Sequence, residues 1–382
     1  MPTPRLFSLA ALVPFAFAIA CGSSNPTPQT DNSPNEGRDG RPARRDSTRR
    51  NTVIENNRPD VGARAGLLVV ANQQGASATV LDAATLNTVA TVPVGQGPHE
   101  VAISTDGRWA VVTNYGVQGT AGNTLSVIDL AAEAPSVVRT IDLGQYQRPH
   151  GVAFVMSGTK LLVTSETAQR LLLVDFVSGR VDTAMATNGR GSHMVTVQRD
   201  GRRAWTSNIS DGTVTEFDID TRTTKRTFPV APNVEGISAT PGGVQVWVGS
   251  NTAKTVTVVN GADAKILGTI SGFGQPYRIG SSRTGRVVLV SDPPSNRIWI
   301  YDTGTRKELA QIDLTNEKGV GSPAAQAGPE GITFDPITEY AYVTLHGTNQ
   351  VVAIDLRTRK TMGFGSVGAG PDGIAFSPLV RH

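Results

Sequence analysis

One structural unit recurs through most of this chain of 382 residues. Each copy reads as a turn with Pro or Gly, a short apolar strand, a hairpin turn, a second apolar strand that ends in Asn or Ser, and two further strands. The equivalent turn positions are spaced by 51, 43, 42, 42, 53 and 42 residues, at His99, His150, His193, Glu235, Tyr277, Glu330 and Asp372. Repeats of this length with four strands are typical of β-propellers, in which each sheet buries both faces only by packing on its neighbours. The sequence therefore predicts an all-β, seven-bladed β-propeller with four antiparallel strands per blade.

The seventh unit is divided between the two ends of the repeat region. Only one strand, at residues 373–376, follows the last turn position, whereas residues 65–72, 78–81 and 88–94 supply three strands with no inner partner at the start. We expect the N-terminal and C-terminal strands to complete one blade together. Such closure removes the exposed sheet edges that an open array would carry.

The strand motifs resemble those of a known family. Second strands read V-V-T-N at residues 111–114 and Y-V-T-L at 342–345, third strands read S-V-I-D and V-A-I-D, and one hairpin reads S-x-D-G. These motifs resemble the YVTN β-propeller repeat family, which includes YncE-like periplasmic proteins, over residues 64–378. The resemblance implies a propeller whose members act as binding scaffolds more often than as enzymes. Function has to be inferred from the site, because one fold hosts many activities.

The first 20 residues resemble a lipoprotein-type signal peptide. Arg5 supplies the positive region, residues 6–17 form an apolar run too short to span a membrane as an ordinary helix, and the sequence A-I-A-C ends at the sole cysteine, Cys21. We expect Cys21 to be lipidated, with Gly22 after it favouring the outer membrane by analogy with known lipoproteins. The alternative is an ordinary A-x-A cleavage site beside an incidental cysteine.

Residues 21–62 are rich in Ser, Asn, Pro, Asp and Arg and have little apolar periodicity, so we expect a disordered tether before a propeller at residues 63–382. Localisation is then the bacterial cell envelope, as an outer-membrane lipoprotein or in the periplasm. The formal charge is +3, whereas residues 41–50 alone carry a net +4, so the rest of the chain is near neutral. Such a domain lacks the basic face that nucleic acids require, whereas the arginine run suits anionic lipid head groups.

In a propeller, the loops into the innermost strands and those after the second strands open on one face, around the channel. The seven turn positions should therefore ring this mouth, together with Arg278 and with His346 at the end of a second strand. His99, His150 and His193 come from consecutive blades and could bind Cu, Zn or Fe. The alternative is that they are ordinary hydrogen-bonding loop residues. Two insertions, at residues 115–123 and 315–328, are also expected to stand over the mouth.

Three functional classes remain open at this point. The first is a monomeric binding scaffold that holds a protein partner, a small ligand or a metal at the channel mouth, with the membrane as a further partner through the lipid anchor. The second is a metal-assisted enzyme, either a copper-dependent redox protein or a hydrolase that resembles propeller lactonases. In the hydrolase, Glu330, Asp372 or Glu166 would act as the base, and Arg278 or Arg148 would hold an anionic substrate. The third is a structural protein of the cell envelope, in which the residues around the channel mouth serve only packing.

Overall fold

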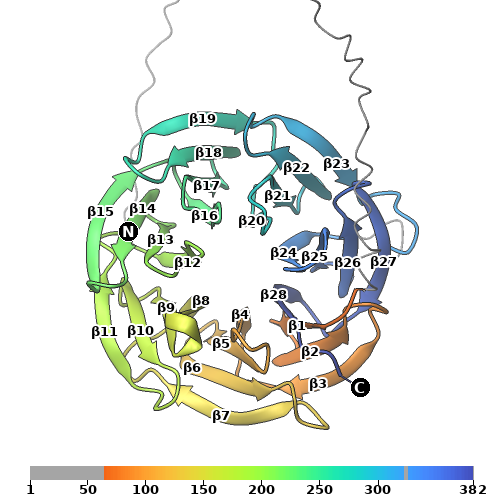
Figure 1. The fold of residues 1–382 in the computed structure, drawn as a ribbon, viewed down its shortest axis with the longest axis horizontal. Coiled ribbons are helices and arrows are strands. Elements are labelled where there is room, and N and C mark those ends of the chain that lie inside the picture. Colours follow the sequence, from red (N-terminus) through yellow and green to blue (C-terminus); the bar gives the residue numbers. More distant parts are fainter. Residues whose placement is uncertain (1–63, 322–325, 382) are drawn as a thin grey trace, which may run out of the picture. The chain divides into compact units, whose positions relative to one another are not determined.

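The computed structural model describes residues 64–321 and 326–381, and these form a closed ring of seven four-stranded antiparallel sheets (Figure 1). The predicted seven-bladed propeller is thus confirmed. The signal peptide, Cys21 and the tether lie outside the described residues. No helix among the described residues is long and apolar enough to span a membrane.

Each blade runs from an innermost strand beside the channel to an outermost strand at the rim (Figure 1). The innermost strands are β4 (Pro98–Ile103), β8 (Pro149–Val155), β12 (Ser192–Val197), β16 (Val234–Ala239), β20 (Ile279–Ser281), β24 (Pro329–Phe334) and β28 (Pro371–Ser377). They begin blades 1 to 7 in this order. The second strands are β5 (Trp109–Val117), β9 (Lys160–Ser165), β13 (Arg203–Asn208), β17 (Gln245–Ser250), β21 (Val287–Asp292), β25 (Tyr340–Leu345) and β1 (Leu67–Asn72).

The third and fourth strands complete each sheet. The third strands are β6 (Thr120–Asp129), β10 (Arg170–Asp175), β14 (Thr213–Asp218), β18 (Thr255–Asn260), β22 (Arg297–Asp302), β26 (Gln350–Asp355) and β2 (Ser77–Asp82). The outermost strands are β7 (Ser136–Asp142), β11 (Val181–Ala186), β15 (Thr223–Pro229), β19 (Ile266–Ser271), β23 (Glu308–Asp313), β27 (Lys360–Ser366) and β3 (Thr88–Pro93). The short 3-10 helix η1 (Met156–Gly158) lies between β8 and β9.

Blade 7 is built from both ends of the repeat region, as predicted. β28 pairs antiparallel with β1, with Leu68 opposite Phe376 and Val70 opposite Ile374. β2 and β3 then continue the sheet outward. Because the two ends share a sheet, β1 gains an inner partner and the last blade closes the ring.

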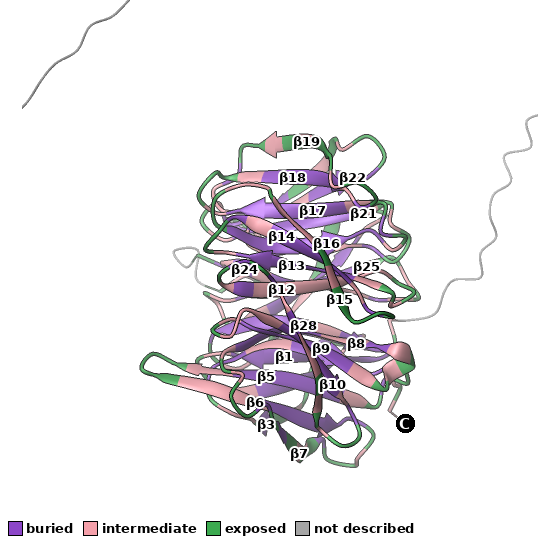
Figure 2. Ribbon diagram, turned by 90° about the vertical axis from the view of Figure 1, so that its left-hand side faces the viewer, coloured by how far each residue is buried: buried purple, intermediate pink, exposed green. Residues whose placement is uncertain are grey.

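The apolar core lies between the blades. Seven clusters of buried side chains occur among the described residues, and each joins two adjacent blades. Second strands such as β17 are buried along nearly their whole length, because both of their faces pack on neighbouring sheets (Figure 2). The ring therefore needs no side chains in the channel to supply its core.

The propeller has two faces, which carry different sets of turns. The channel-mouth face carries the connections between blades and the turns between second and third strands. On this face, β5 and β6 extend into a hairpin that projects from the ring, at the left of Figure 2. The far face carries the turns between first and second strands, for example residues 282–286, and it faces the viewer in Figure 1.

Candidate functional site

The mouth ring consists of the seven turn positions, each at or next to the start of an innermost strand. The threonine or serine of the second-strand motif fixes many of these positions, because its hydroxyl donates a hydrogen bond to the backbone carbonyl of a ring residue in the next blade. Four such bonds join Thr113 to His150 (3.0 Å), Thr164 to His193 (2.6 Å), Ser207 to Glu235 (2.8 Å) and Thr344 to Asp372 (2.7 Å). The repeat motif therefore holds the ring in place as well as forming strands.

The residue after each ring position is confined by the neighbouring blade. Four blades have glycine there, and an added Cβ would lie 2.6 Å from Val195 N at Gly151, 2.6 Å from Tyr277 O at Gly236, 2.2 Å from Asp372 O at Gly331 and 2.3 Å from His99 O at Gly373. Contacts this short do not occur in real structures, so glycine is required. Two of the three exceptions are charged residues of opposite sign, Glu100 and Arg278.

Arg278 is the centre of an ion-pair cluster in the channel, and it is only 3% exposed. From blade 5, its guanidinium reaches Glu100 Oε1 of blade 1 at 3.0 Å, Glu235 Oε1 of blade 4 at 2.9 Å and Asp372 Oδ1 of blade 7 at 3.2 Å. Its guanidinium carbon also lies 4.3 Å from the centre of the Tyr277 ring. A buried charge persists only with such partners, so the three carboxylates and Arg278 stabilise one another.

The carboxylates of this cluster differ in acidity. Burial raises the pKa of Glu100 to about 7, and the opposing charge of Arg278 does not compensate. Burial would also raise the pKa of Asp372 and Glu235. For Asp372, Arg278 and the His99 hydrogen bond outweigh burial and hold the pKa below its usual value; for Glu235, His193 and Arg278 do the same. Near neutral pH, Glu100 is therefore the member of the cluster that can take up or release a proton.

Three histidines form a row beside this cluster. The ring centres of His99 and His150 are 4.5 Å apart, and those of His150 and His193 are 3.7 Å apart. His99 Nδ1 lies 2.7 Å from Asp372 Oδ2, and His193 Nε2 lies 2.6 Å from Glu235 Oε1. The imidazoles of His99 and His193, at the two ends of the row, are thus each held by a carboxylate of the mouth ring.

His150, in the middle of the row, differs from its neighbours. It is 1% exposed, and neither of its ring nitrogens has a hydrogen-bond partner among the described residues. Burial, together with the nearby His193 and His99, lowers its pKa well below the usual value, so this imidazole is neutral. By contrast, the charge and hydrogen bond of Glu235 and the nearby carboxylate of Glu166 overcome burial and raise the pKa of His193 to about 9. A neutral imidazole with free nitrogens lies next to a protonated one.

The projecting hairpin contributes to the same site through Tyr115. Its ring packs edge-on against His99, with centres 4.6 Å apart, and its hydroxyl donates to Glu166 Oε2 at 2.8 Å. The guanidinium carbon of Arg148 lies 4.7 Å from the centre of the Tyr115 ring, and Arg148 donates a hydrogen bond to the carbonyl of Val117 at 3.1 Å. The hairpin is therefore tied to the histidine row rather than detached from it.

A second, smaller pair lies on blade 6. His346 Nδ1 is 3.3 Å from Glu330 Oε2, and Gln74 Nε2 is 3.1 Å from His346 Nε2. The Glu330 hydrogen bond raises the pKa of His346, and burial raises that of Glu330. This pair is more exposed than the histidine row.

The structure thus places all the predicted site residues around one mouth: His99, His150, His193, Glu235, Tyr277, Arg278, Glu330, His346 and Asp372. It does not point them at one centre. The three candidate metal ligands stack instead of converging, and no group of three His, Cys, Asp or Glu side chains with metal-binding geometry occurs in residues 64–321 and 326–381. A site for Cu, Zn or Fe would require these rings to turn, and metal binding stays a prediction.

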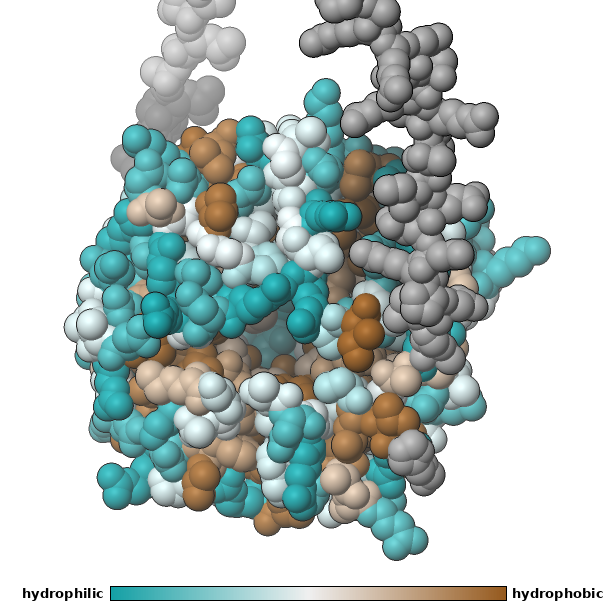
Figure 3. Space-filling view, in the orientation of Figure 1, coloured by the Kyte–Doolittle hydropathy of each residue, from teal (hydrophilic) through white to brown (hydrophobic). Residues whose placement is uncertain are grey.

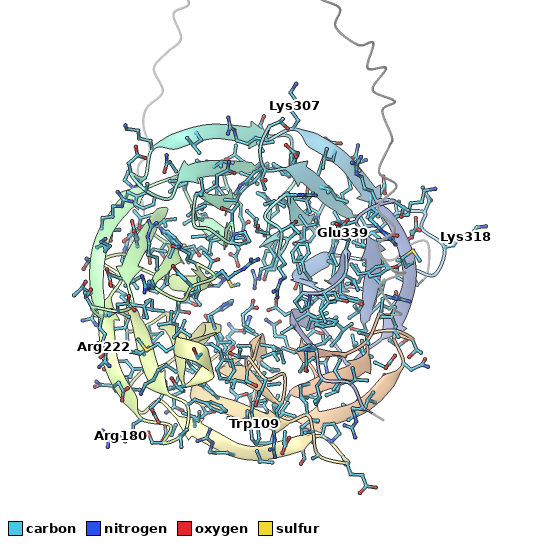
Figure 4. All side chains as sticks on the ribbon, viewed as in Figure 1. Trp109, Arg180, Arg222, Lys307, Lys318 and Glu339 are labelled. Atoms are coloured by element: carbon cyan, nitrogen blue, oxygen red, sulfur yellow. The ribbon has the colours of Figure 1, made fainter. Side chains whose placement is uncertain are left out.

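Part of the insertion at residues 315–328 was predicted in the wrong place. Residues 315–321 do not stand over the channel mouth. Thr361 of β27 donates a hydrogen bond to Glu317, Gln350 Nε2 donates to the carbonyl of Gly319 at 2.9 Å, and Lys318 points away from the ring (Figure 4). The segment begins at the rim, where β23 ends, and Val320 packs on the apolar cluster between blades 5 and 6. Apolar burial at the rim therefore outweighs the course that the spacing suggested.

Sequence reasoning missed Glu100, Tyr115 and Gln73 as members of the site. Gln73 Nε2 lies 2.9 Å from His99 Nε2. A signal for Glu100 was present, because the position after the ring residue is glycine in four blades and charged in only two. Tyr115 begins the insertion at residues 115–123 that was expected over the mouth, but the sequence did not show that its ring would pack on His99.

Comparisons with known proteins support the fold and do not identify the activity. No family model matches the sequence, and no curated protein does. Among 1726 matching chains of solved structures is a protein of Desulfotomaculum acetoxidans DSM 771, described as functionally unknown. The two are 15% identical with a TM-score of 0.68, over 82% of this chain and 99% of that one. So broad a likeness indicates a propeller and no particular function.

Proposed function

We propose that this chain is an exported, lipid-anchored propeller of the YVTN type, which acts as a binding scaffold through its channel-mouth face. The strand motifs, the A-I-A-C sequence ending at Cys21 and the ring of ionisable residues at the mouth support this proposal. Clusters of perturbed titratable groups are enriched at functional sites.

The unpartnered histidine carries the proposal. A buried polar group without a hydrogen-bond partner costs about 1–3 kcal/mol, so packing alone would favour an apolar residue at His150. The ring does not need this side chain for its core, which lies between the blades. A ligand that hydrogen-bonds to or coordinates His150 would remove the cost.

The surroundings of His150 indicate which ligands suit it. A neutral imidazole nitrogen is a good ligand for Cu, Zn or Fe, and Glu235 and Asp372 supply carboxylates nearby. The hairpin beside the row offers contact area for a larger small-molecule or protein ligand. We place the metal first, because the free nitrogens belong to a histidine flanked by two others.

The test is to purify the full chain from its own cell envelope and to measure bound species by native mass spectrometry and elemental analysis. We expect an added mass, or near-stoichiometric Cu, Zn or Fe, that His150→Phe loses and that Arg222→Ala on the far face keeps. Equal, bare masses for the wild type and both variants would contradict the proposal. Cys21→Ser in the same cells should move the protein from the membrane to the soluble fraction; unchanged fractionation would remove the lipid anchor from the proposal.

A metal-assisted enzyme is the second candidate, and one observation favours it. Glu100, with a pKa of about 7, and His193, with a pKa of about 9, both lie at the channel mouth. General acid–base catalysts have pKa values in this range. The hydrolytic form predicts that the purified chain cleaves a lactone such as dihydrocoumarin and that Glu100→Gln slows the reaction. If the wild-type protein does not cleave the lactone, alone or with added Zn, the hydrolase hypothesis fails and the binding scaffold remains.

A further inference from the structure

A pocket of about 470 Å³ opens on the far face, at the opposite end of the channel from the histidine row. It lies between the first turns of blades 5 and 6. Arg199, from the first turn of blade 3, reaches across the glycine-rich turn of blade 4 and donates a hydrogen bond to the carbonyl of Arg283. Figure 3 shows this face hollowed near its centre, with hydrophilic side chains along the upper edge of the hollow and more apolar ones along its lower edge.

Three guanidinium groups line the pocket, from Arg199, Arg283 and Arg286. In the described part of the chain, none of them has a carboxylate oxygen within 4.0 Å. Some arginines elsewhere on the far face are paired, as in the contacts of Arg108 with Asp129 and of Arg203 with Glu216. The pocket therefore gathers positive charge that the protein itself does not neutralise.

Two carboxylates also line the pocket, and they do not cancel this charge. Asp335 is 2% exposed and accepts hydrogen bonds from the backbone N–H groups of Ile337 and Thr338 at 2.8 and 3.2 Å. Its oxygens are thus directed at its own turn. Glu339 is exposed at the edge of the pocket (Figure 4). With three positive and two negative groups, the lining is net positive.

Part of the remaining wall is apolar. Phe334, Pro336 and Ile337 line the blade 6 side, and Ile337 is 68% exposed. A ligand that fits both parts carries an anionic group on an apolar body. Phosphate suits three guanidiniums better than carboxylate, because it offers more oxygens for paired N–H donors.

We propose that this far-face pocket binds an organic phosphate, with the phosphate between Arg199, Arg283 and Arg286 and the apolar part against Phe334 and Ile337. Two sources share this chemistry: a soluble phosphate ester and a phospholipid head group. Residues 64–66, which precede β1, lie at the far face, because β1 runs from this face toward the channel mouth. A lipid source would orient the channel mouth away from the membrane.

The experiment uses the full chain with Cys21→Ser, so that no lipid is attached, and two charge-matched double variants. Arg283→Ala/Arg286→Ala removes two of the three guanidinium groups from the pocket. Arg180→Ala/Lys307→Ala removes the same charge from the outer rim of the ring (Figure 4). Binding of phenyl phosphate is measured by calorimetry. Binding to phosphatidylcholine vesicles, with and without phosphatidylglycerol, is measured by sedimentation.

We expect the pocket variant to lose roughly tenfold or more in affinity and the rim variant less than about twofold, because a hydrogen bond to a charged group is worth about that factor. The loss appears with phenyl phosphate if the ligand is a soluble ester, and only with phosphatidylglycerol vesicles if it is a lipid head group. No binding of either probe, or equal losses in both variants, would overturn the proposal. The channel-mouth variant His150→Phe should retain this binding, which separates the two sites.

Discussion

The guanidinium of Arg278 lies 3.0 Å from the carboxylate of Glu100, across the channel and 178 positions away in the sequence. The same guanidinium contacts carboxylates of blades 4 and 7. Four blades are therefore joined through one side chain at the channel mouth, in addition to the sheet that closes blade 7. Arg278 also contacts Asp372 and Glu235, the two carboxylates that hold His99 and His193.

Arg278→Met should destabilise the propeller by about 3–5 kcal/mol, because it leaves buried carboxylates without their counter-charge. Urea unfolding followed by tryptophan fluorescence measures this change. Arg222→Ala, an exposed substitution at the rim, should change stability by less than about 0.5 kcal/mol. A loss of under about 1 kcal/mol in Arg278→Met would show that the cluster does not join the blades.

The hydroxyl-to-carbonyl bonds of the repeat motif should have a measurable, smaller effect. Thr164→Val keeps the shape of the side chain but removes the 2.6 Å bond to the carbonyl of His193. We expect a loss of about 1 kcal/mol in the free energy of unfolding and a changed chemical shift for the His193 ring, measured by NMR. An unchanged His193 signal would mean that this bond does not position the ring residue.

Stability should fall as the pH rises from about 7 to about 9. His193 has a pKa near 9 in the folded chain against 6.5 ordinarily, so its contribution is complete below pH 6.5 and disappears as pH passes 9. Glu100 has a folded pKa near 7 against 4.5, so the folded state also binds more protons between these values. The lowered pKa values of Glu235, Asp372 and His150 act the other way, but only below about pH 7, because the ordinary pKa values of these groups are 4.5, 3.8 and 6.5.

The variant His193→Gln separates the contribution of His193 to the pH dependence of stability from that of Glu100. The histidine contribution is on the order of 3 kcal/mol for a shift of this size. Thermal unfolding at pH 6 and pH 9.5 should therefore show a smaller difference in Tm for the variant than for the wild type. A wild-type Tm that rises over this range would contradict the assigned protonation states.

The fold could be predicted from the sequence because the repeat spacing, the strand motifs and the divided seventh unit all point to one architecture. The ring positions followed from the same spacing. The contacts within the channel did not follow, since Arg278 meets Glu100 and Asp372 only after the ring has closed. The segment at 315–321 was misplaced because spacing shows where a loop begins and ends but not what its apolar residues pack against.

The projecting hairpin should contribute to binding and not to folding. Its tip, residues 117–120, lies beyond the blade, and Val117 is exposed. Replacing residues 117–120 by a two-residue Asn-Gly turn should leave the free energy of unfolding within about 0.5 kcal/mol. If the hairpin contacts the ligand, the species that co-purifies with the wild type should be lost or reduced; full retention would exclude the hairpin tip from the site.

The most direct test of the binding site is the stability of His150 variants in ligand-free protein. His150→Phe and His150→Leu remove two buried, unpartnered nitrogens, and using two shapes guards against overpacking by either side chain. If the residue is kept for a ligand, at least one variant should be as stable as the wild type or more stable, by about 1 kcal/mol, while both lose the bound species. Both variants losing more than about 1 kcal/mol while keeping the same bound content would show that His150 serves packing and would contradict the channel-mouth site.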